Sequence, residues 1–283
     1  MIMILILKKF YLLVGCIVFV ASCAQQPGSL DYKWEKFSIK GQRTGVTPVG
    51  SDNFEKALGT VEGSVYKAPN GKIYEGGCAP AIAKIMLEAQ PGMAYLREVV
   101  GHSKNGMAKQ VPESSLSNWT ADLMISEGRK IFGHRIDAGI TNFGGIRVDF
   151  GAGDIILDDV RSMFPFRNYL CAVEIKGTRL QEILDDLASR KIAAVGGIRM
   201  TIENGKAVSV SVGGKPINPD KYYWLATVDF LLDGGDGYFF AKDARKVENS
   251  GKTLGQIVEA YVKACTKKGI SIDYAKDGRV VRK

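Results

Sequence analysis

Histidine is scarce in this sequence, which contains only His102 and His134 among its 283 residues. Neither histidine lies in a metal-binding motif, whereas a zinc or dinuclear phosphoesterase site needs several closely placed histidines and carboxylates. A GxSxG elbow is missing as well, and Gly251-Lys252-Thr253 lacks the leading glycine of a phosphate-binding loop. The sequence therefore predicts no catalytic residues, no metal ligands and no cofactor of its own.

Cysteine is also rare, with five residues spread along the chain. So few and so scattered cysteines do not indicate a disulfide framework. Cys171 and Cys265 lie in apolar patterns typical of a strand and a helix. We expect both to be small buried side chains of the core, and neither to be a nucleophile.

Positive charge exceeds negative charge only modestly. The formal net charge is +8, and it is +6 without residues 1–22, which contain two lysines and no acidic residue. The sequence has no basic block and no stripe of cations interleaved with aromatic residues, so it does not indicate nucleic-acid binding. A mild positive balance is compatible with a small anionic ligand.

Residues 1–22 are expected to be a lipoprotein signal peptide. Lys8 and Lys9 precede an apolar run that ends at Val20 and is about half as long as a membrane span requires. The following Ala21-Ser22-Cys23 completes a stretch that resembles the bacterial lipobox, which implies lipidation of Cys23. Ala24 resembles the residue that directs lipoproteins to the outer membrane. We therefore expect a lipid-anchored protein of the cell envelope, attached at the outer membrane on its periplasmic or its surface side.

Regular structure is predicted mainly after residue 77. Residues 23–77 are polar and glycine-rich and are expected to form a tether and an irregular or hairpin-like lead-in. Apolar residues recur at helical spacing in three later segments, residues 116–123, 180–187 and 254–265. Ser114-Ser115 precede the first segment, and the capping boxes Thr178-x-x-Gln181 and Thr253-x-x-Gln256 open the other two.

Strands are predicted between these helices, at residues 171–175, 198–202, 208–212 and 222–230. Asn204-Gly205 predicts a type I′ turn between the second and the third of them. Hairpins mixed with isolated helices, without strict alternation, indicate an α+β domain over residues 78–283, with a mixed sheet and packed helices.

Four loops combine glycine or proline with an aromatic ring or a polar side chain. Taken singly, each loop could be an ordinary turn, a surface ion pair or a ring packed back onto the domain. Taken together, they could form a site in which two rings clamp a planar base, polar groups fix a sugar, and glycine allows close approach. The loops are ITNFGGIR with Asn142 and Arg147, MFPFRN with Phe166 and Asn168, VGGIR with Gly197, and DFLLDGGDGYFF with Phe230 and Asp236.

These four motifs, in this order and spacing, resemble the C-terminal substrate-binding domain of 5′-nucleotidases. The stretches VEIKGTRLQEIL, KPINPDKYYWLA and PESSLSNWTADLM extend the resemblance from about Leu96 to Lys283. The resemblance implies the compact α+β fold of that family. It also implies roles in substrate binding: Phe166 and Phe230 sandwich the nucleobase, Asn142 and Asn168 are its polar partners, Arg147 contacts ribose or phosphate, Asp236 accepts ribose hydroxyls, and Gly197 admits the ligand to the backbone.

The sequence departs from the family at several positions. Pro112 stands where an arginine is usual, and Ser117, Phe143 and Arg167 replace glycines. These changes affect the expected phosphate end of the site more than the base clamp, so phosphate binding stays open. The metallophosphoesterase half of the family, with its metal ligands and catalytic His–Asp pair, is absent from this sequence.

The expected function is the nucleoside- or nucleotide-recognition half of a split 5′-nucleotidase-type hydrolase in nucleotide catabolism. A separate metallophosphatase polypeptide would supply the divalent metals and the attacking water. Recognition and chemistry are separable, because positioning of the substrate alone contributes several kcal/mol to catalysis. Two alternatives are a stand-alone nucleoside-binding lipoprotein without enzymatic role and a degenerate domain kept as an interaction module.

The lipobox resemblance predicts the effect of Cys23→Ala. Because the acyl chains provide the attachment, we expect the variant to incorporate no palmitate analogue and to move from the membrane fraction into the soluble fraction. Its thermal melt should not change, since Cys23 precedes the expected domain. Cell fractionation and metabolic labelling measure both effects. Continued labelling and membrane association of the variant would show that the predicted lipidation site is wrong.

Overall fold

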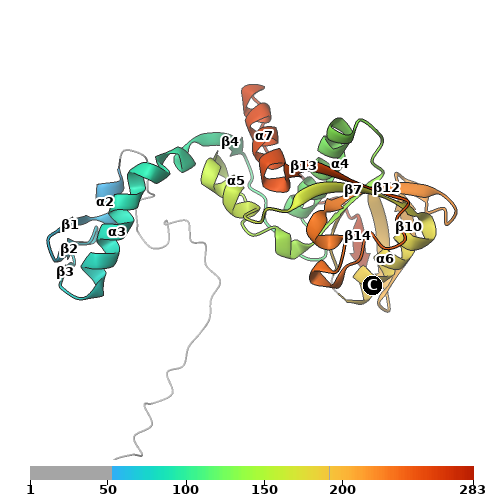
Figure 1. The fold of residues 1–283 in the computed structure, drawn as a ribbon, viewed down its shortest axis with the longest axis horizontal. Coiled ribbons are helices and arrows are strands. Elements are labelled where there is room, and N and C mark those ends of the chain that lie inside the picture. Colours follow the sequence, from blue (N-terminus) through green and yellow to red (C-terminus); the bar gives the residue numbers. More distant parts are fainter. Residues whose placement is uncertain (1–52, 191) are drawn as a thin grey trace, which may run out of the picture. The chain divides into compact units, whose positions relative to one another are not determined.

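The structure is a computed structural model that describes residues 53–190 and 192–283 (Figure 1). The expected signal peptide, the lipidation site Cys23 and the first part of the expected tether lie outside the described residues. No helix among the described residues combines the length and the apolar character needed to cross a membrane.

A five-stranded mixed sheet forms the centre of the domain. Its strand order is β13-β7-β12-β5-β8, with β5 parallel to β12 and every other pair antiparallel. The sheet confirms the α+β class that the sequence predicts. The strands are β5 (Ala138–Thr141), β7 (Tyr169–Lys176), β8 (Ala194–Gly196), β12 (Tyr222–Val228) and β13 (Lys246–Thr253).

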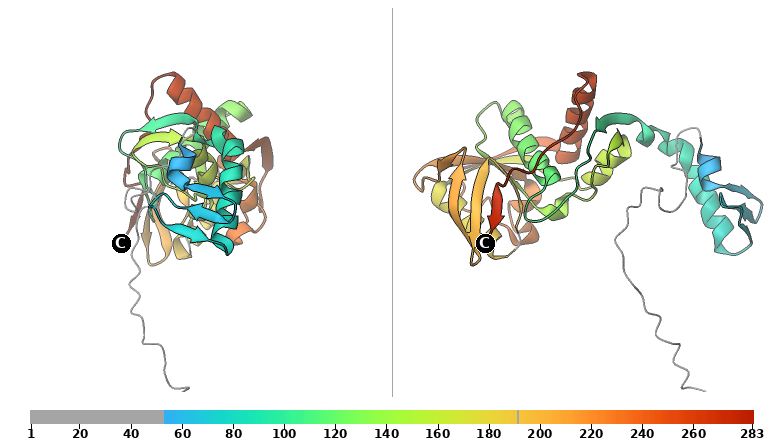
Figure 2. Two further views of the ribbon diagram at one scale, coloured as in Figure 1. Left: turned by 90° about the vertical axis from the view of Figure 1, so that its left-hand side faces the viewer. Right: turned by 180° about the vertical axis from the view of Figure 1, so that it is seen from behind.

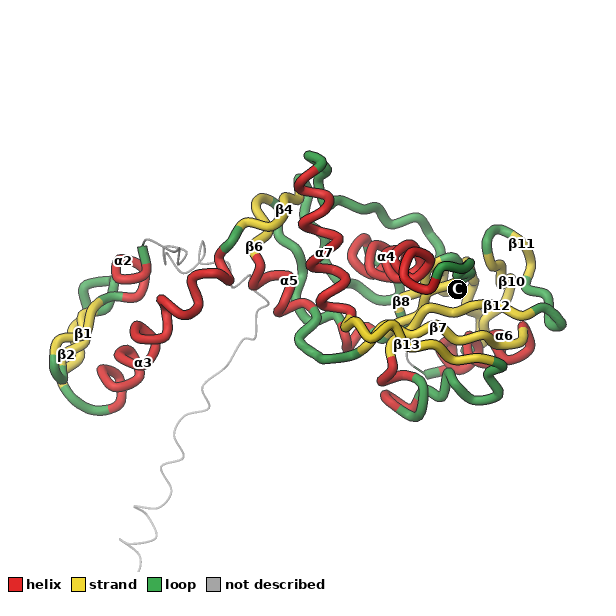
Figure 3. Tube along the Cα trace, turned by 45° about the horizontal axis from the view of Figure 1, so that its top comes forward, coloured by secondary structure: helices red, strands yellow, loops and turns green. Residues whose placement is uncertain are grey.

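Helices α4 (Ser115–Phe132) and α6 (Gly177–Ser189) cover the two faces of this sheet, as Figures 1 and 3 show. Residues 170–175 of β7 are all buried, although successive side chains of a strand point to opposite faces. A strand buried on both faces loses the alternation of apolar and polar residues, which explains the continuous apolar run LCAV in its sequence.

Glycine sets the distance between α4 and the sheet. A Cβ on Gly139 of β5 would lie only 2.6 Å from the carbonyl oxygen of Ala121 in α4. The neighbouring Gly196 of β8 pairs with Gly139, and a Cβ there would lie 2.9 Å from the carbonyl carbon of Ala121. Any side chain at these two positions would push the helix away from the strands.

The three predicted helices form, but only two have the expected caps. Ser114 caps α4 through the backbone N–H of Ser117 at 3.0 Å, and Thr253 caps α7 (Leu254–Lys267) in a capping box with Gln256. The capping box predicted for Thr178 and Gln181 is wrong. Because β7 continues directly into α6 at Gly177, Gln181 instead donates to the carbonyl of Ala207 at 3.0 Å.

A second sheet of four strands has the order β11-β10-β9-β14. The predicted type I′ turn forms between β9 and β10, with φ of 48° at Asn204 and 74° at Gly205. Strand β14, near the end of the chain, pairs in parallel with β9, and Figure 2 shows the two side by side. The bounds are β9 (Ile198–Glu203), β10 (Lys206–Val212), β11 (Lys215–Pro216) and β14 (Val280–Arg282).

The strands β4 and β6 form an antiparallel pair on which α7 packs, together with α5. The ring of Trp119 in α4 meets the ring of Tyr261 in α7 edge to face, with centroids 6.2 Å apart. Cys171 and Cys265 are buried and free, as predicted, and burial raises the pKa of the Cys171 thiol to about 12. The bounds are β4 (Val99–Ser103), β6 (Gly153–Ile156) and α5 (Leu157–Met163).

The described part of the expected lead-in is more regular than the sequence suggested. Three short strands form an antiparallel sheet of order β1-β2-β3, on which helix α3 packs. Helix α3 therefore belongs with the strands that precede residue 78, since its packed face lies against them. The elements are α2 (Phe54–Leu58), β1 (Thr60–Glu62), β2 (Val65–Lys67), β3 (Ile73–Glu75), α3 (Cys78–Met93) and the 3₁₀ turn η1 (Ala94–Arg97).

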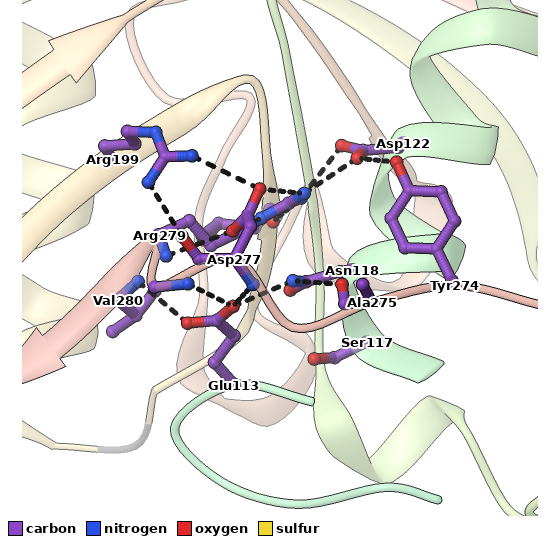
Figure 4. A network of polar contacts seen from close by, with 12 residues as sticks. Glu113, Ser117, Asn118, Asp122, Arg199, Tyr274, Ala275, Asp277, Arg279 and Val280 are labelled. Atoms are coloured by element: carbon purple, nitrogen blue, oxygen red, sulfur yellow. Dashed lines mark hydrogen bonds and ion pairs between the residues drawn. The ribbon is translucent and has the colours of Figure 1, made fainter. Parts of the chain in front are cut away.

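A buried carboxylate joins the last residues of the chain to the start of α4 (Figure 4). Glu113 accepts hydrogen bonds from the side chain of Asn118 and from the backbone N–H groups of Asp277, Gly278 and Val280, at 2.8–3.3 Å. These four donors satisfy a charge that would otherwise be costly to bury. Three backbone N–H groups of the segment that leads into β14 thus donate their hydrogen bonds to Glu113 and not to other backbone groups.

Arg279 makes a second buried ionic contact beside Glu113. Its guanidinium donates to Asp122 of α4 at 2.8–2.9 Å, to Asp277 at 3.0 Å and to the carbonyl of Val195 in β8 at 3.0 Å. A hydrogen bond from Arg279 lowers the pKa of Asp277. Arg279 therefore ties three separate pieces together: α4, β8 and the C-terminal segment.

Glu113→Ala is expected to destabilise the domain strongly. It leaves the buried N–H of Val280 and the buried side-chain amide of Asn118 short of an acceptor, and each such group costs about 1–3 kcal/mol, while the N–H groups of the exposed Asp277 and Gly278 can bind water. We expect the free energy of unfolding to fall by about 3 kcal/mol or more, measured by urea denaturation with the m-value checked for two-state behaviour.

Glu203→Ala is the matched control, because it also removes a carboxylate that contacts the C-terminal strand. Glu203 and Lys283 form an exposed ion pair at 3.2 Å, which is worth less than about 1 kcal/mol. Equal losses from Glu113→Ala and Glu203→Ala would contradict a special role for the buried carboxylate.

Candidate functional site

One edge of the five-stranded sheet collects most of the predicted binding residues. The register puts Thr141 of β5, Val228 of β12 and Leu170 of β7 at one level, because β5 runs parallel to β12 and β7 runs antiparallel to it. Asn142 and Phe230 follow the first two strands, and Asn168 precedes the third. Three loops far apart in the sequence therefore meet at this edge.

Strand β12 ends two residues earlier than predicted, at Val228. Asp229 and Phe230 instead begin the 3₁₀ turn η3 (Asp229–Leu231). The carboxylate of Asp229 accepts from the backbone N–H of Phe230 and of Tyr169, both at 2.9 Å. The two N–H groups that bind Asp229 therefore do not take part in strand pairing. Asp229 links the Phe230 loop to the Asn168 loop.

Gly235 and Asp236 of DGGDG each have a structural reason for their place in the loop. A Cβ on Gly235 would lie 1.8 Å from the carbonyl oxygen of Phe230 and 2.8 Å from its ring, so only glycine fits against this residue. Asp236 has a φ of 52° in the second 3₁₀ turn, η4 (Gly235–Gly237), a left-handed conformation that aspartate tolerates. The loop folds back so that Asp236 faces the Asn142 loop.

Asn142 and Asp236 are in direct contact. The side-chain amide of Asn142 donates to the carboxylate of Asp236 at 2.6 Å, although 94 residues separate them in the sequence. Asn142 is buried, and its Oδ1 has no hydrogen-bond partner. A buried acceptor without a donor costs about 1–3 kcal/mol, so this atom is suited to a ligand that offers an N–H or O–H group.

A shallow hollow lies beside this pair. Its wall includes Asn142, Phe166 and Asn168, together with apolar atoms of Phe164, Val228 and Leu254. The rings of Phe166 and Phe230 are 48% and 45% exposed, and they do not contact each other. Exposed rings of this size are available to stack on a planar ligand, since they are not consumed by core packing.

Arginine lies next to one of the rings. The guanidinium carbon of Arg147 is 5.9 Å from the centre of the Phe166 ring, and its Nη1 is 3.4 Å from the carbonyl oxygen of Gly144. Arg147 and Arg167 are both exposed. In the loop that carries Asp236, burial raises the pKa of Tyr238, and the negative charge of Asp236 raises this pKa further. The site therefore combines exposed cations with a carboxylate that Asn142 holds in place.

Gly197 does not join the other predicted residues. It follows β8 at the level of Ala138, which is four residues from Asn142, or about 13 Å along the strand. Its φ is 68°, and a Cβ there would lie 2.4 Å from the carbonyl oxygen of Asp137. The glycine is needed for the close approach of two strands, and it lines a different hollow with Arg199.

Two residues that support the site were not identified from the sequence. Asp229 is the link described above, and its position at the end of an apolar strand was a possible signal. Lys109 donates to the carbonyls of Ile146 at 2.5 Å and Phe143 at 3.3 Å, and so closes the turn η2 (Phe143–Gly145) after Asn142. No pattern in the sequence connects Lys109 with that turn.

The two histidines lie apart from this site. Nδ1 of His102 is 3.2 Å from Asp154, and Nε2 of His134 is 2.8 Å from Glu248, whose hydrogen bond raises the pKa of His134. Within residues 53–190 and 192–283, no group of three or more His, Cys, Asp or Glu side chains is arranged to hold a metal ion.

Comparison with known proteins adds an independent finding. The family model for the C-terminal domain of 5′-nucleotidases matches residues 99–243, a range that contains all the predicted binding residues. Protein UshA of Yersinia enterocolitica is 29% identical over 266 residues, which cover 90% of this chain and 46% of UshA. A 5′-nucleotidase of Vibrio cholerae is 31% identical over 135 residues, covering 46% of this chain and 24% of that protein.

A solved structure agrees with these matches at the level of the fold. The 5′-nucleotidase precursor from Thermus thermophilus aligns with a TM-score of 0.63 and 23% identity, covering 77% of this chain and 46% of that one. The chain spans less than half the length of each of these three proteins. Because the family model matches more than half of the sequence, the protein belongs to the family of 5′-nucleotidase C-terminal domains.

Proposed function

We propose that this protein is the nucleoside- or nucleotide-recognition half of a split 5′-nucleotidase, with a separate metallophosphatase polypeptide supplying the catalytic metals. It acts in nucleotide catabolism at the cell envelope, attached through a lipid on Cys23. The observation that carries the proposal is the meeting of two exposed rings with the Asn142–Asp236 pair at one edge of the sheet.

The geometry suits a nucleoside in three ways. Phe166 and Phe230 offer ring faces for a base, and stacking of this kind contributes about 1–3 kcal/mol per base. Oδ1 of Asn142 is a buried acceptor without a donor, which a base amino group or a sugar hydroxyl can satisfy. The second oxygen of Asp236 is available to ribose hydroxyls, while its neighbour is held by Asn142.

The length of the relatives supports the proposed division of labour. The matched relatives are more than twice as long as the region they share with this chain. A recognition half can still assist catalysis when a second polypeptide provides the chemistry, because holding the substrate in the reactive geometry lowers the barrier. Arg147, which lies next to the Phe166 ring, and Arg167, which follows Phe166 in the sequence, would lie toward the phosphate of a bound nucleotide.

Phe166→Ala and Phe230→Ala are each expected to weaken adenosine binding by about 1–3 kcal/mol. The melting temperature should change little, because both rings are about half exposed and contribute little to the core. Isothermal titration calorimetry and thermal melts of the mature protein measure the two effects. Phe239→Ala is the matched control, since Phe239 lies in the same loop and is 53% exposed but lines a different hollow, with Arg179 and Arg190.

Asp236→Asn separates recognition of the sugar from recognition of the base. Asparagine keeps the shape and tolerates the left-handed backbone, but it loses the charged acceptor. We expect affinity for adenosine to fall by about 1.5–3 kcal/mol, the value of a hydrogen bond to a charged group, while affinity for free adenine stays nearly unchanged. Equal losses for both ligands, or no adenosine binding by the parent protein, would contradict the proposed site.

The purified mature protein is expected not to hydrolyse AMP, with or without added Mn²⁺ or Zn²⁺. Two histidines on separate elements cannot provide the ligand set of a dinuclear site. Addition of the metallophosphatase partner should produce hydrolysis that Phe230→Ala reduces. Metal-dependent turnover by this chain alone would refute the split enzyme, and nucleoside binding without any effect on a metallophosphatase would favour a stand-alone binding lipoprotein.

A further inference from the structure

Helix α3 carries an exposed apolar face. Ile82, Ile85, Met86 and Met93 are 43% to 67% exposed. Their spacing of three, four and eleven residues from Ile82 puts them on one side of an α-helix. We call these four side chains the α3 face. Large apolar side chains gathered on one exposed surface typically mark a place where another molecule binds.

The opposite side of α3 buries little apolar surface. It packs on β1, β2 and β3, and its buried residues are only Pro80, Ala83 and Gln90. Each of the three strands has three residues, and none of these nine residues is fully buried. The outer strands β1 and β3 each have an edge that no described strand pairs with. So small a sheet buries too little apolar surface to be stable without further packing.

The charged residues of α3 argue against a membrane surface as the molecule that binds the α3 face. Helices that lie on membranes are rich in lysine and arginine around their apolar face. Helix α3 has one lysine and one glutamate, Lys84 and Glu88, which lie 3.9 Å apart as an ion pair. The rim of the α3 face is therefore neutral and suits an apolar protein surface.

The relatives indicate which protein covers this surface. The match to Protein UshA includes 90% of this chain, so it extends over the three strands and α3 wherever it begins, yet it fills only 46% of that relative. In the relative, the same segment is covalently continuous with a second half of the chain. A segment with an incomplete core, which in a relative is continuous with a second half, is expected to bind that half where a separate polypeptide supplies it, as proposed above.

We propose that the α3 face is the docking surface for the metallophosphatase polypeptide. This inference rests on the proposed function, which supplies the partner. Docking buries Ile82, Ile85 and Met86 against apolar side chains of the partner, and the open edges of β1 and β3 provide backbone hydrogen bonds. The recognition residues lie on other elements, so docking and nucleoside binding are separable by mutation.

Site-specific crosslinking in the native host tests the surface with the full-length protein. A photoreactive benzoylphenylalanine replaces Ile85, or replaces Ile270 as a matched control with 52% exposure. After irradiation, mass spectrometry is expected to identify a metallophosphatase in the adduct at position 85 and none at position 270. An adduct at position 85 with a second copy of this chain, with lipid alone, or with no polypeptide would overturn the proposal.

The metallophosphatase purified from that adduct is the probe for a binding measurement. Ile85→Glu is expected to weaken its binding to the mature protein at least about tenfold, because a charge enters an apolar interface. Ile270→Glu should have no effect, and adenosine binding should be unchanged in both variants. Equal affinity of the Ile85→Glu variant and the parent for the metallophosphatase would refute docking. A parent protein that does not bind adenosine would refute only the recognition site.

Discussion

The buried carboxylate of Glu113 is the constraint on which the domain depends. A charge removed from water must be matched by donors, and Glu113 finds them in Asn118 and in three backbone N–H groups of the C-terminal segment. This requirement fixes where residues 277–280 cross the start of α4. Arg279 is thereby directed at Asp122 and at the carbonyl of Val195, so that α4, β8 and β14 are held by one ionic cluster.

The position of the binding residues follows from that cluster through the packing of α4. Gly139 and Gly196 bring β5 and β8 against the helix so closely that neither position accepts a side chain. The sheet built on these strands then presents Asn142, Asn168 and Phe230 at one edge. Asp229 and Lys109 complete the arrangement by holding the loops through backbone groups, which leaves the rings and the amide oxygen for a ligand.

Two surfaces with different chemistry result, and they serve different parts of the proposed function. The sheet edge is a polar and aromatic site whose orphan acceptor suits a small molecule. The α3 face is apolar, lies on a segment with almost no core of its own, and suits a protein. A half-enzyme needs both properties, because it must bind its substrate and also be held beside the polypeptide that supplies the chemistry.

The sequence by itself determined the α+β class, the helices α4, α6 and α7, the Asn204-Gly205 turn and the loops that carry Asn142, Phe166, Asn168, Phe230 and Asp236. These features depend on local periodicity, turn chemistry or motif order, which are readable along the chain. Only the tertiary structure decided that Asn142 bonds Asp236 across 94 residues, that Lys109 closes the turn after Asn142, and that Gly197 lies at the far end of β5. It also turned the expected lead-in into strands packed on α3. Pairing register and buried charge act between segments far apart in the sequence, so no local pattern records them.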